Sequence, residues 1–244
     1  MTDPLIRVRD LTLAWGSRVL LRDASFEVER GDVFVILGGS GCGKSTLLRH
    51  LIGLEVPRAG SIELAGIGAP VLDGRMPEFG VMFQGGALFS SLSVEENVAF
   101  ALHEWTELPP VAIAAIVKAK LALVGLEGAE DKLPAELSGG MRKRAAIARA
   151  MAFEPNLLFL DEPSAGLDPV SAAELDELIG VLNRALGLTV VIVTHELSSI
   201  FLIGKNCIML DRESQSIIAR GDPRELARTT KDARVRRFFS REAR

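Results

Sequence analysis

The chain has 244 residues, of which 48% are hydrophobic and 25% are charged, and its formal net charge is −4. These values fit one large globular domain, or one domain with an insertion, and they argue against a general binder of nucleic acid or membrane surfaces. The sequence shows no secretory signal and no apolar run near the roughly 18 residues of a membrane span, so any link to a membrane is expected to go through a partner.

The first part of the chain is predicted to consist of strands with one helix among them. Alternating or continuous apolar runs indicate strands at 6–15, 24–30, 32–39, 60–64 and 79–84. Between the third and fourth runs, leucines at helical spacing predict a helix over 41–54.

Helices are predicted to dominate from about residue 90 to 151. Ser93 and Glu96 form a capping-box pattern, and the prolines at 109–110 open a second helix. Further on, apolar strands at 156–163 and 188–196 flank another helical segment. This alternation predicts a parallel sheet covered on both faces, with a helical segment inserted between its halves.

The segment 38–46, GGSGCGKST, satisfies the pattern G-x-x-x-x-G-K-[ST] and lies between a predicted strand and a predicted helix. The backbone N–H groups of such a loop and the N-terminus of the helix point at phosphate oxygens. Lys44 is predicted to supply a cation to the β- and γ-phosphates, and Ser45 a hydroxyl to Mg²⁺.

Two carboxylates, Asp161 and Glu162, end an apolar strand, where ligands sit in open α/β sheets. Asp161 is predicted to hold the magnesium shell, and Glu162 to polarise a water for in-line attack on the γ-phosphate. Gln84, Asp168 and His195 also follow strands or lie in loops. A lone His after a strand is more often a structural hydrogen-bonder than a catalyst, and Gln and Asp in loops are usually turn formers, so each alone is a weak signal.

The segment 137–151, LSGGMRKRAAIARAM, predicts a helix whose N-cap is Ser138. A helix N-terminus behind two glycines is an anion site, and three cations at 142–144 follow it. The pattern alone leaves two interpretations open, because the anion is either nucleic-acid phosphate or a nucleotide.

Several motifs occur in a recognisable order along the chain. They are Trp15, the loop 38–46, Gln84, LSGG at 137–140, LLFLDEP at 157–163, SAGLD at 164–168 and His195. This set resembles the ATP-binding subunits of ABC transporters, over about residues 5–222. The resemblance implies an α/β fold, namely a P-loop NTPase of ABC type. Such a fold has a mostly parallel sheet core, an antiparallel β subdomain and an inserted helical subdomain.

The resemblance also implies a domain division. Residues 1–222 would form the nucleotide-binding domain, with the helical subdomain inserted at roughly 88–152. Residues 223–244 would form a basic C-terminal tail, since nine Lys or Arg against four Asp or Glu lie between residues 220 and 244.

ATP and Mg²⁺ are the cofactors that the resemblance implies. Trp15 would stack on adenine, Gln84 would contact Mg²⁺ or the attacking water and sense the membrane partner, and His195 would hold the γ-phosphate. The implied catalytic residues are Lys44, Gln84, Glu162 and His195, and the implied Mg²⁺ ligands are Ser45, Gln84 and Asp161. The implied ATP contacts are Trp15, Gly38, Gly39, Ser40, Gly41, Cys42, Gly43, Lys44, Ser45, Thr46, Ser138, Gly139, Gly140 and Asp168.

In this family the signature loop, here Ser138 to Gly140, contacts the γ-phosphate of ATP bound to the opposite subunit, and Asp168 matches the loop linking the two sites. The resemblance thus implies a head-to-tail dimer of two copies with two ATP molecules between them, and the nucleic-acid interpretation loses its support. Met141 stands where Gln is usual and cannot donate a hydrogen bond to a ribose.

The segments 83–102 and 137–150 are similar to the ATPases of Mce/Mla-type systems, which move phospholipids across the Gram-negative envelope. The similarity implies an integral membrane permease and an MCE-domain protein as partners, allows for a small cytosolic regulator, and implies no nucleic acid. It places the chain in the cytoplasm, peripheral on the inner face of the inner membrane. The alternative is an ABC ATPase for another cargo, such as an amino acid, a metal or a lipoprotein.

The apolar segment 86–89, GALF, is expected to line the groove that receives a permease helix, with core packing as the alternative. Two cysteines, Cys42 and Cys207, are too few for a disulfide framework, so reduced thiols are expected. Because Cys42 lies at a helix N-terminus, its thiol is expected to have a lowered pKa, and alkylation there is expected to block ATP binding.

Overall fold

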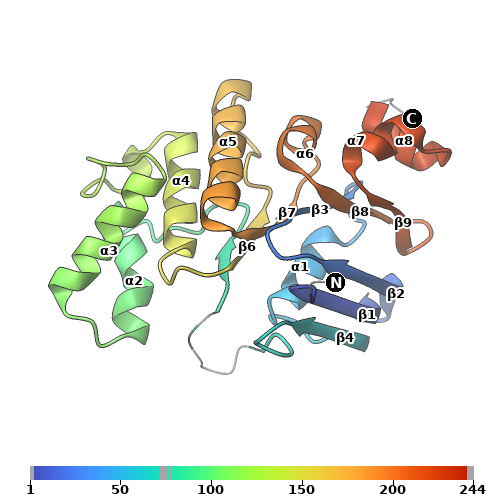
Figure 1. The fold of residues 1–244 in the computed structure, drawn as a ribbon, viewed down its shortest axis with the longest axis horizontal. Coiled ribbons are helices and arrows are strands. Elements are labelled where there is room, and N and C mark those ends of the chain that lie inside the picture. The colour runs from blue at the N-terminus through green and yellow to red at the C-terminus, as the bar shows by residue number, and fades with distance from the viewer. Residues whose placement is uncertain (1–2, 72–75, 77, 241–244) are drawn as a thin grey trace.

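The computed structural model describes residues 3–71, 76 and 78–240, which form two sheets surrounded by helices (Figure 1). The strands are β1 (Ile6–Trp15), β2 (Arg18–Val28), β3 (Val33–Gly38), β4 (Ala59–Leu64), β5 (Gly80–Met82), β6 (Leu157–Asp161), β7 (Thr189–Val193), β8 (Asn206–Asp211) and β9 (Ser216–Gly221). The helices are α1 (Lys44–Leu51), α2 (Val94–Trp105), α3 (Pro110–Leu123), the 3₁₀ turn η1 (Pro134–Glu136), α4 (Gly139–Ala150), α5 (Pro169–Leu186), α6 (Leu197–Ile203), α7 (Pro223–Thr229) and α8 (Ala233–Ser240).

The larger sheet has the strand order β5-β6-β7-β3-β8-β9, and all its pairings are parallel except that of β8 with β9. Every residue of β3, β6 and β7 is buried, which explains why these strands are continuous apolar runs in the sequence. The predicted parallel sheet is confirmed. The smaller sheet, β2-β1-β4, is antiparallel, as the fold class requires.

Alternate residues of β3 enter two different cores, one on each face of the larger sheet. Val33, Val35 and Leu37 pack with α4, α5 and α6, whereas Phe34 and Ile36 pack with α1 and the smaller sheet. Figure 1 shows the same layers, with α5 and α6 on one side of the sheet and α1 with the smaller sheet on the other. Successive side chains of a strand point to opposite faces of the sheet, so the position of a residue along β3 decides which of the two cores it enters.

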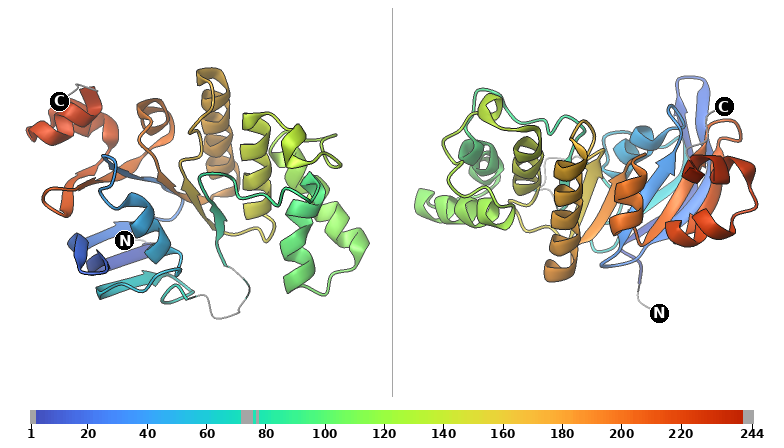
Figure 2. Two further views of the ribbon diagram at one scale, coloured as in Figure 1. Left: turned by 180° about the vertical axis from the view of Figure 1, so that it is seen from behind. Right: turned by 90° about the horizontal axis from the view of Figure 1, so that it is seen from above.

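Helices α2, α3 and α4 stand together at one end of the molecule, away from α7 and α8 (Figure 2). The chain leaves the larger sheet after β5, forms these helices and returns as β6, which pairs with β5. The predicted capping box is present, since the Ser93 hydroxyl accepts from the Glu96 N–H and the Glu96 carboxylate accepts from the Ser93 N–H.

The helix predicted over 41–54 is shorter in the structure, because Gly43 adopts a left-handed conformation and acts as its N-cap. The strand predicted at 24–30 begins earlier, at Arg18, as one arm of a hairpin with β1. The patterns after residue 196 predicted no elements, yet two strands and three helices form there.

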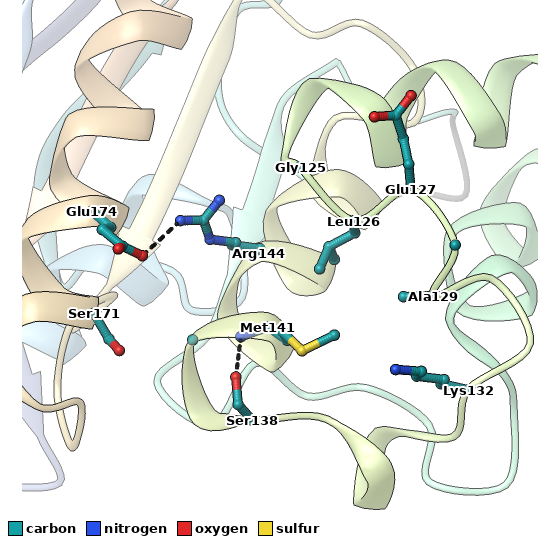
Figure 3. A pocket seen from close by; sticks show the side chains of 12 residues that line it. Gly125, Leu126, Glu127, Ala129, Lys132, Ser138, Met141, Arg144, Ser171 and Glu174 are labelled. Carbon is teal, nitrogen blue, oxygen red and sulfur yellow. Dashed lines mark hydrogen bonds and ion pairs between the residues drawn. The ribbon is translucent and has the colours of Figure 1, made fainter.

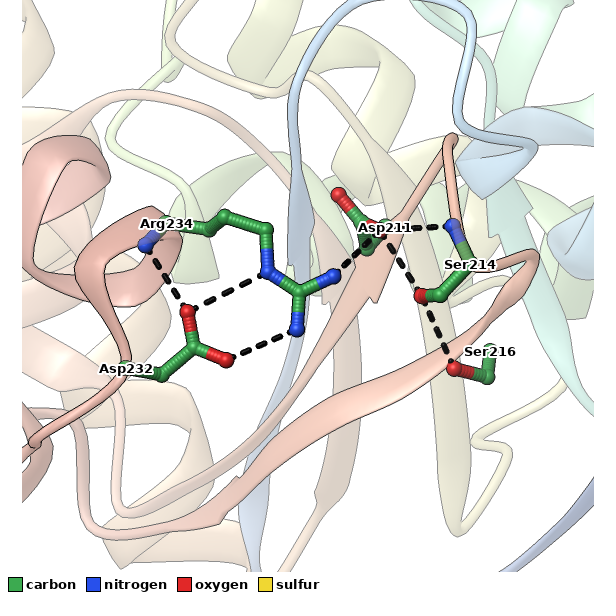
Figure 4. A network of polar contacts seen from close by, with 5 residues as sticks. All are labelled: Asp211, Ser214, Ser216, Asp232 and Arg234. Carbon is green, nitrogen blue, oxygen red and sulfur yellow. Dashed lines mark hydrogen bonds and ion pairs between the residues drawn. The ribbon is translucent and has the colours of Figure 1, made fainter.

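The C-terminal helices are tied to the larger sheet by a polar network (Figure 4). Arg234 of α8 binds Asp211 at the end of β8 at 2.9 Å and Asp232 at 2.8 Å. The Arg234 hydrogen bonds lower the pKa of Asp232 to about 2. Val235 and Phe239 of the same helix lie in the main core, so this basic segment is packed against the domain as far as residue 240.

A buried carboxyl, Asp176, lies on α5 with 1% of its surface exposed and contacts Ser199 of α6. Burial raises its pKa to about 6. Above the ordinary value of 3.8 the unfolded state releases this proton, but the folded state keeps it until about pH 6. The group therefore makes stability fall as the pH rises from about 4 to about 6, and the loss is complete above that window.

Replacing Asp176→Asn removes this titration while it keeps the shape of the side chain. We expect the variant to be more stable than the wild type at pH 7.5, by about 1 to 3 kcal/mol, and equally stable near pH 4. Urea unfolding at several pH values measures the difference. A stability difference that stays constant over this range would contradict the buried titration.

Candidate active site

The loop between β3 and α1 is shaped by glycine. Gly38 has a φ of 145°, and a Cβ there would lie 2.5 Å from both the Cys42 Sγ and the Leu210 carbonyl oxygen. The Lys44 Nζ donates to the carbonyl oxygens of Gly38 at 2.9 Å and Gly39 at 3.2 Å. The ammonium is therefore held over the loop, where a phosphate-binding cation is required.

The expected lowering of the Cys42 pKa is wrong. The thiol is 2% exposed, and burial raises its pKa even though the charge of Lys44 acts in the opposite direction. Desolvation outweighs the helix N-terminus because the side chain points into the core beneath Gly38. The expectation that alkylation at Cys42 blocks ATP binding loses its basis, since a buried thiol with a raised pKa is unreactive.

The catalytic candidates Glu162 and His195 meet at the carboxyl ends of neighbouring strands. The Glu162 Oε1 lies 2.7 Å from the His195 Nδ1, although the two residues are 33 positions apart. Glu162 has a φ of 48°, and its N–H donates to the Val193 carbonyl oxygen at 2.8 Å. A left-handed conformation is uncommon for glutamate, and its persistence at this position is typical of an active site.

Asp161, at the end of β6, is 9% exposed. Burial and the neighbouring Glu162 raise the pKa of its carboxyl, while Lys44 acts to lower it. Its Oδ1 and the Oε2 of Glu162 are buried and have no hydrogen-bond partner among the residues that the structure describes. Free carboxylate oxygens beside the positive charge of Lys44 suit the oxygen coordination that Mg²⁺ prefers. These residues therefore fit the cation that the sequence predicts.

Gln84 lies exposed in the loop that follows β5. Its carbonyl oxygen accepts a hydrogen bond from the Lys143 Nζ at 2.5 Å, and the same ammonium donates to the Glu162 carbonyl oxygen at 3.3 Å. Lys143 thus links two site residues, and sequence reasoning missed it because it treated the cations 142–144 as one group. The sequence around Lys143 carries no signal of these contacts, because both partners are backbone carbonyls remote in sequence.

The LSGG segment forms the start of α4, as predicted, with the Ser138 Oγ accepting from the Met141 N–H at 3.2 Å. Asp168 caps α5 by accepting from the Val170 and Ser171 N–H groups. A hydrogen bond from the Ser171 side chain, together with these N–H groups, lowers the pKa of the Asp168 carboxyl. The glycines pack against this helix start, since a Cβ on Gly139 would lie 3.0 Å from the Leu167 side chain.

A cavity of about 290 Å³ lies beside this helix start (Figure 3). Ser138, Met141, Arg144 and Glu174 are among its lining residues, and an ion pair of 3.3 Å joins Arg144 to Glu174.

Trp15, the residue expected to stack on adenine, lies at the end of β1 and is 66% exposed. Asp161, Glu162 and His195 thus form one cluster, and Ser138, Gly139, Gly140 and Asp168 form a second one at the starts of α4 and α5.

The cations after LSGG are engaged within the chain. Arg142 donates to the Leu137 carbonyl oxygen, and Arg144 to the Val124 carbonyl oxygen. Lys143 is 8% exposed. These contacts explain the basic run as a structural feature of α4, which gives no support to a nucleic-acid patch.

A glycine loop between a strand and a helix, with two carboxylates at the end of a nearby parallel strand, defines a P-loop nucleotide-binding protein of the α/β class. The model of the family described as ABC transporter matches residues 21–165. The chain belongs to the ABC transporter family and is an ATPase of ABC type that binds nucleotide.

Relatives over most of the chain support this assignment. The intermembrane phospholipid transport system ATP-binding protein MlaF of Haemophilus influenzae is 39% identical over 100% of this chain and 93% of its own length. MlaF of Escherichia coli is 40% identical over 96% of this chain and 88% of its own length. The probable ribonucleotide transport ATP-binding protein mkl of Mycobacterium tuberculosis is 42% identical over 96% of this chain, which spans only 66% of that relative.

Solved structures of ABC proteins share the fold. The cbiO1 protein of Clostridium perfringens, part of the ABC transporter complex cbiONQ, has a TM-score of 0.81 and 32% identity, over 92% of this chain and 90% of its own. A dimeric ATP-binding cassette in a post-hydrolysis state, bound to ADP and phosphate, has a TM-score of 0.78 and 27% identity. The match covers 89% of this chain and 98% of the cassette. Of the helices described in the present chain, none has the length and apolar character needed to cross a membrane.

Proposed function

We propose that this chain hydrolyses ATP to drive a transporter of phospholipid, or of a related hydrophobic compound, across the Gram-negative envelope. The contact between Glu162 and His195 beside Asp161 carries the hydrolytic part of this proposal. The similarity to two MlaF proteins over nearly the full length of each supports the cargo.

In this proposal the residues of the loop 38–46 bind the phosphates, with Lys44 on the β- and γ-phosphates and the backbone N–H groups around them. Ser45, Gln84 and Asp161 hold Mg²⁺, which supplies charge neutralisation to the phosphates when it is bound. Trp15 provides a π-face for adenine.

Glu162 acts as the base in this mechanism. Its carboxylate orients a water molecule and accepts its proton while the water oxygen attacks the γ-phosphorus in line. His195 holds the Glu162 side chain through the 2.7 Å contact and is exposed enough, at 57% of its side chain, to reach the γ-phosphate as well.

A second copy of the chain would complete the site. Ser138, Gly139 and Gly140 form the N-terminus of α4, and the positive end of a helix suits the γ-phosphate of ATP held by the other subunit. Leu167 and Ser171, on either side of Asp168, lie against these glycines, and Asp168 would link the two sites. The dimeric arrangement of the similar ADP-bound cassette supports this proposal.

The partner in the membrane would dock on an apolar groove of about 450 Å³. Phe89 and Phe100 line this groove with their ring centroids 4.9 Å apart, and they are 46% and 43% exposed. Of the predicted GALF segment, Phe89 faces the groove, whereas Leu88 packs against the core. We propose an integral permease as the occupant, with the chain on the cytoplasmic, inner face of the inner membrane.

Co-purification tests the cargo and the partners together. The tagged chain, extracted from membranes in mild detergent, is expected to bring down a permease, an MCE-domain protein and phospholipid, all identified by mass spectrometry; any small cytosolic regulator would appear in the same sample. Phe89→Ser is expected to reduce recovery of the membrane proteins at least tenfold, because it removes an apolar anchor from the groove, while ATP binding is retained.

The alternative is a different cargo: an amino acid, a metal or a lipoprotein. The name of the mycobacterial relative adds ribonucleotides to these. A permease and substrate-binding protein of one of those classes in the same purification, with no MCE-domain protein, would contradict the phospholipid proposal.

A further inference from the structure

Lys143 is a buried lysine whose ammonium lies between two loops of the active site. It extends from α4 with 8% of its surface exposed. Its Nζ donates to the carbonyl oxygen of Gln84, in the loop after β5, and to that of Glu162, in the loop after β6. One side chain thus joins the helix that carries LSGG to the two loops that carry the candidate water- and metal-binding residues.

Burying an ammonium is unfavourable unless hydrogen bonds replace its hydration. The burial lowers the pKa of Lys143, while the charges of Glu162 and Asp161 act to raise it. Lys120, the other buried lysine, offers a contrast, since its Nζ lies 2.7 Å from the Glu154 carboxylate. Lys143 instead bonds backbone carbonyls, and this choice of partner points to a role in holding the backbone in place.

The backbone that Lys143 holds at Glu162 has an uncommon conformation. Glu162 adopts a left-handed conformation. Its N–H donates to the Val193 carbonyl oxygen, and its own carbonyl oxygen accepts from the Ala165 N–H at 3.2 Å and from the Lys143 ammonium at 3.3 Å. Both polar groups of the residue are therefore fixed, and with them the direction in which its carboxylate leaves the backbone toward His195. Without the ammonium, the carbonyl of this strained residue would keep only the local bond from Ala165 and would lose the contact that joins it to α4.

The Gln84 loop has a second attachment to the same helix. Arg149 donates to the carbonyl oxygens of Gly86 at 2.9 Å and Ala87 at 2.6 Å. Loss of Lys143 would therefore leave this loop on α4 but would remove the bond between α4 and the carbonyl of Glu162, which would keep only its local bond from Ala165. The expected defect lies in the placement of Glu162 and leaves the fold intact.

We propose that Lys143 is a positioning residue for ATP hydrolysis, which fixes the backbone of Glu162 and links it to the Gln84 loop and to α4. This inference rests on the proposed role of Glu162 as the base. The Lys143 ammonium bonds the carbonyls of Gln84 and Glu162 and no residue of the 38–46 loop, so its loss is expected to lower kcat and to leave nucleotide affinity unchanged.

The test compares Lys143→Met, which keeps the length and loses every donor, with Lys143→Arg, which keeps charge and several donors. Lys120→Met serves as the matched control for loss of a buried lysine. We expect the kcat for ATP hydrolysis to fall at least tenfold in Lys143→Met, with KM and the Kd for ATP within threefold of the wild type. Lys143→Arg is expected to keep at least a third of the wild-type kcat, and Lys120→Met to keep all of it.

A kcat within threefold of the wild type in Lys143→Met overturns the inference, and so does a Lys143→Arg that is as slow as Lys143→Met. If Lys143→Met melts below the assay temperature, Lys143→Leu, which also lacks a donor, replaces it under the same criteria. Glu162→Gln is measured in parallel. If that variant turns over ATP normally, the proposed function fails; if it is inactive while Lys143→Met is normal, only the present inference fails.

Discussion

Glu162→Gln is expected to abolish ATP turnover and to leave ATP binding intact. The amide keeps the shape of the side chain and an oxygen that can accept from the His195 Nδ1, which lies 2.7 Å away in the wild type. It lacks the basicity needed to accept a proton from water. A positioned general base contributes about 10²- to 10⁴-fold, so we expect kcat to fall by that factor.

Binding without hydrolysis has a second consequence for Glu162→Gln. Two bound ATP molecules stabilise the dimer by mass action, and the variant cannot release this stabilisation through turnover. We therefore expect an ATP-dependent dimer to accumulate, as measured by light scattering after size exclusion, whereas the variant without nucleotide should match the wild type.

Glu177→Gln is the matched control, because Glu177 lies exposed on α5 outside the proposed site. It is expected to hydrolyse ATP at the wild-type rate. Near-normal turnover in Glu162→Gln would remove Glu162 as the base.

Lys44→Ala is expected to lose nucleotide affinity. The Lys44 ammonium already lies over the loop, hydrogen-bonded to the carbonyl oxygens of Gly38 and Gly39, so little reorganisation is needed for it to meet a phosphate. Hydrogen bonds to charged groups contribute roughly 1.5 to 3 kcal/mol each. Loss of one or two such bonds corresponds to a Kd weakened by about 10- to 100-fold or more.

Titration with a fluorescent ATP analogue measures this change in Kd. Lys118→Ala provides the control, since Lys118 is exposed on α3. A thermal melt of each variant without nucleotide separates loss of binding from loss of fold. Unchanged ATP affinity in a folded Lys44→Ala would contradict the assignment of the 38–46 loop.

Part of the site could be predicted from sequence because its determinants are local. The glycine loop, the strand before it and the helix after it are contiguous, and the capping residues Ser93, Ser138 and Asp168 lie within three positions of the N–H groups that they accept from. The continuous apolar runs of β3, β6 and β7 likewise report burial on both faces of a parallel sheet. The assignment to a transporter ATPase came from the order of such local motifs.

The sequence by itself therefore determined the class of fold, the phosphate-binding loop and the candidate acids. Only the tertiary structure decided that Glu162 meets His195, that Lys143 binds two site carbonyls, and that the Cys42 pKa is raised. Contacts of this kind depend on the strand order β6-β7-β3 and on packing by segments remote in sequence. Desolvation in particular is a property of everything that surrounds a group, so no local pattern around Cys42 or Lys143 could reveal it.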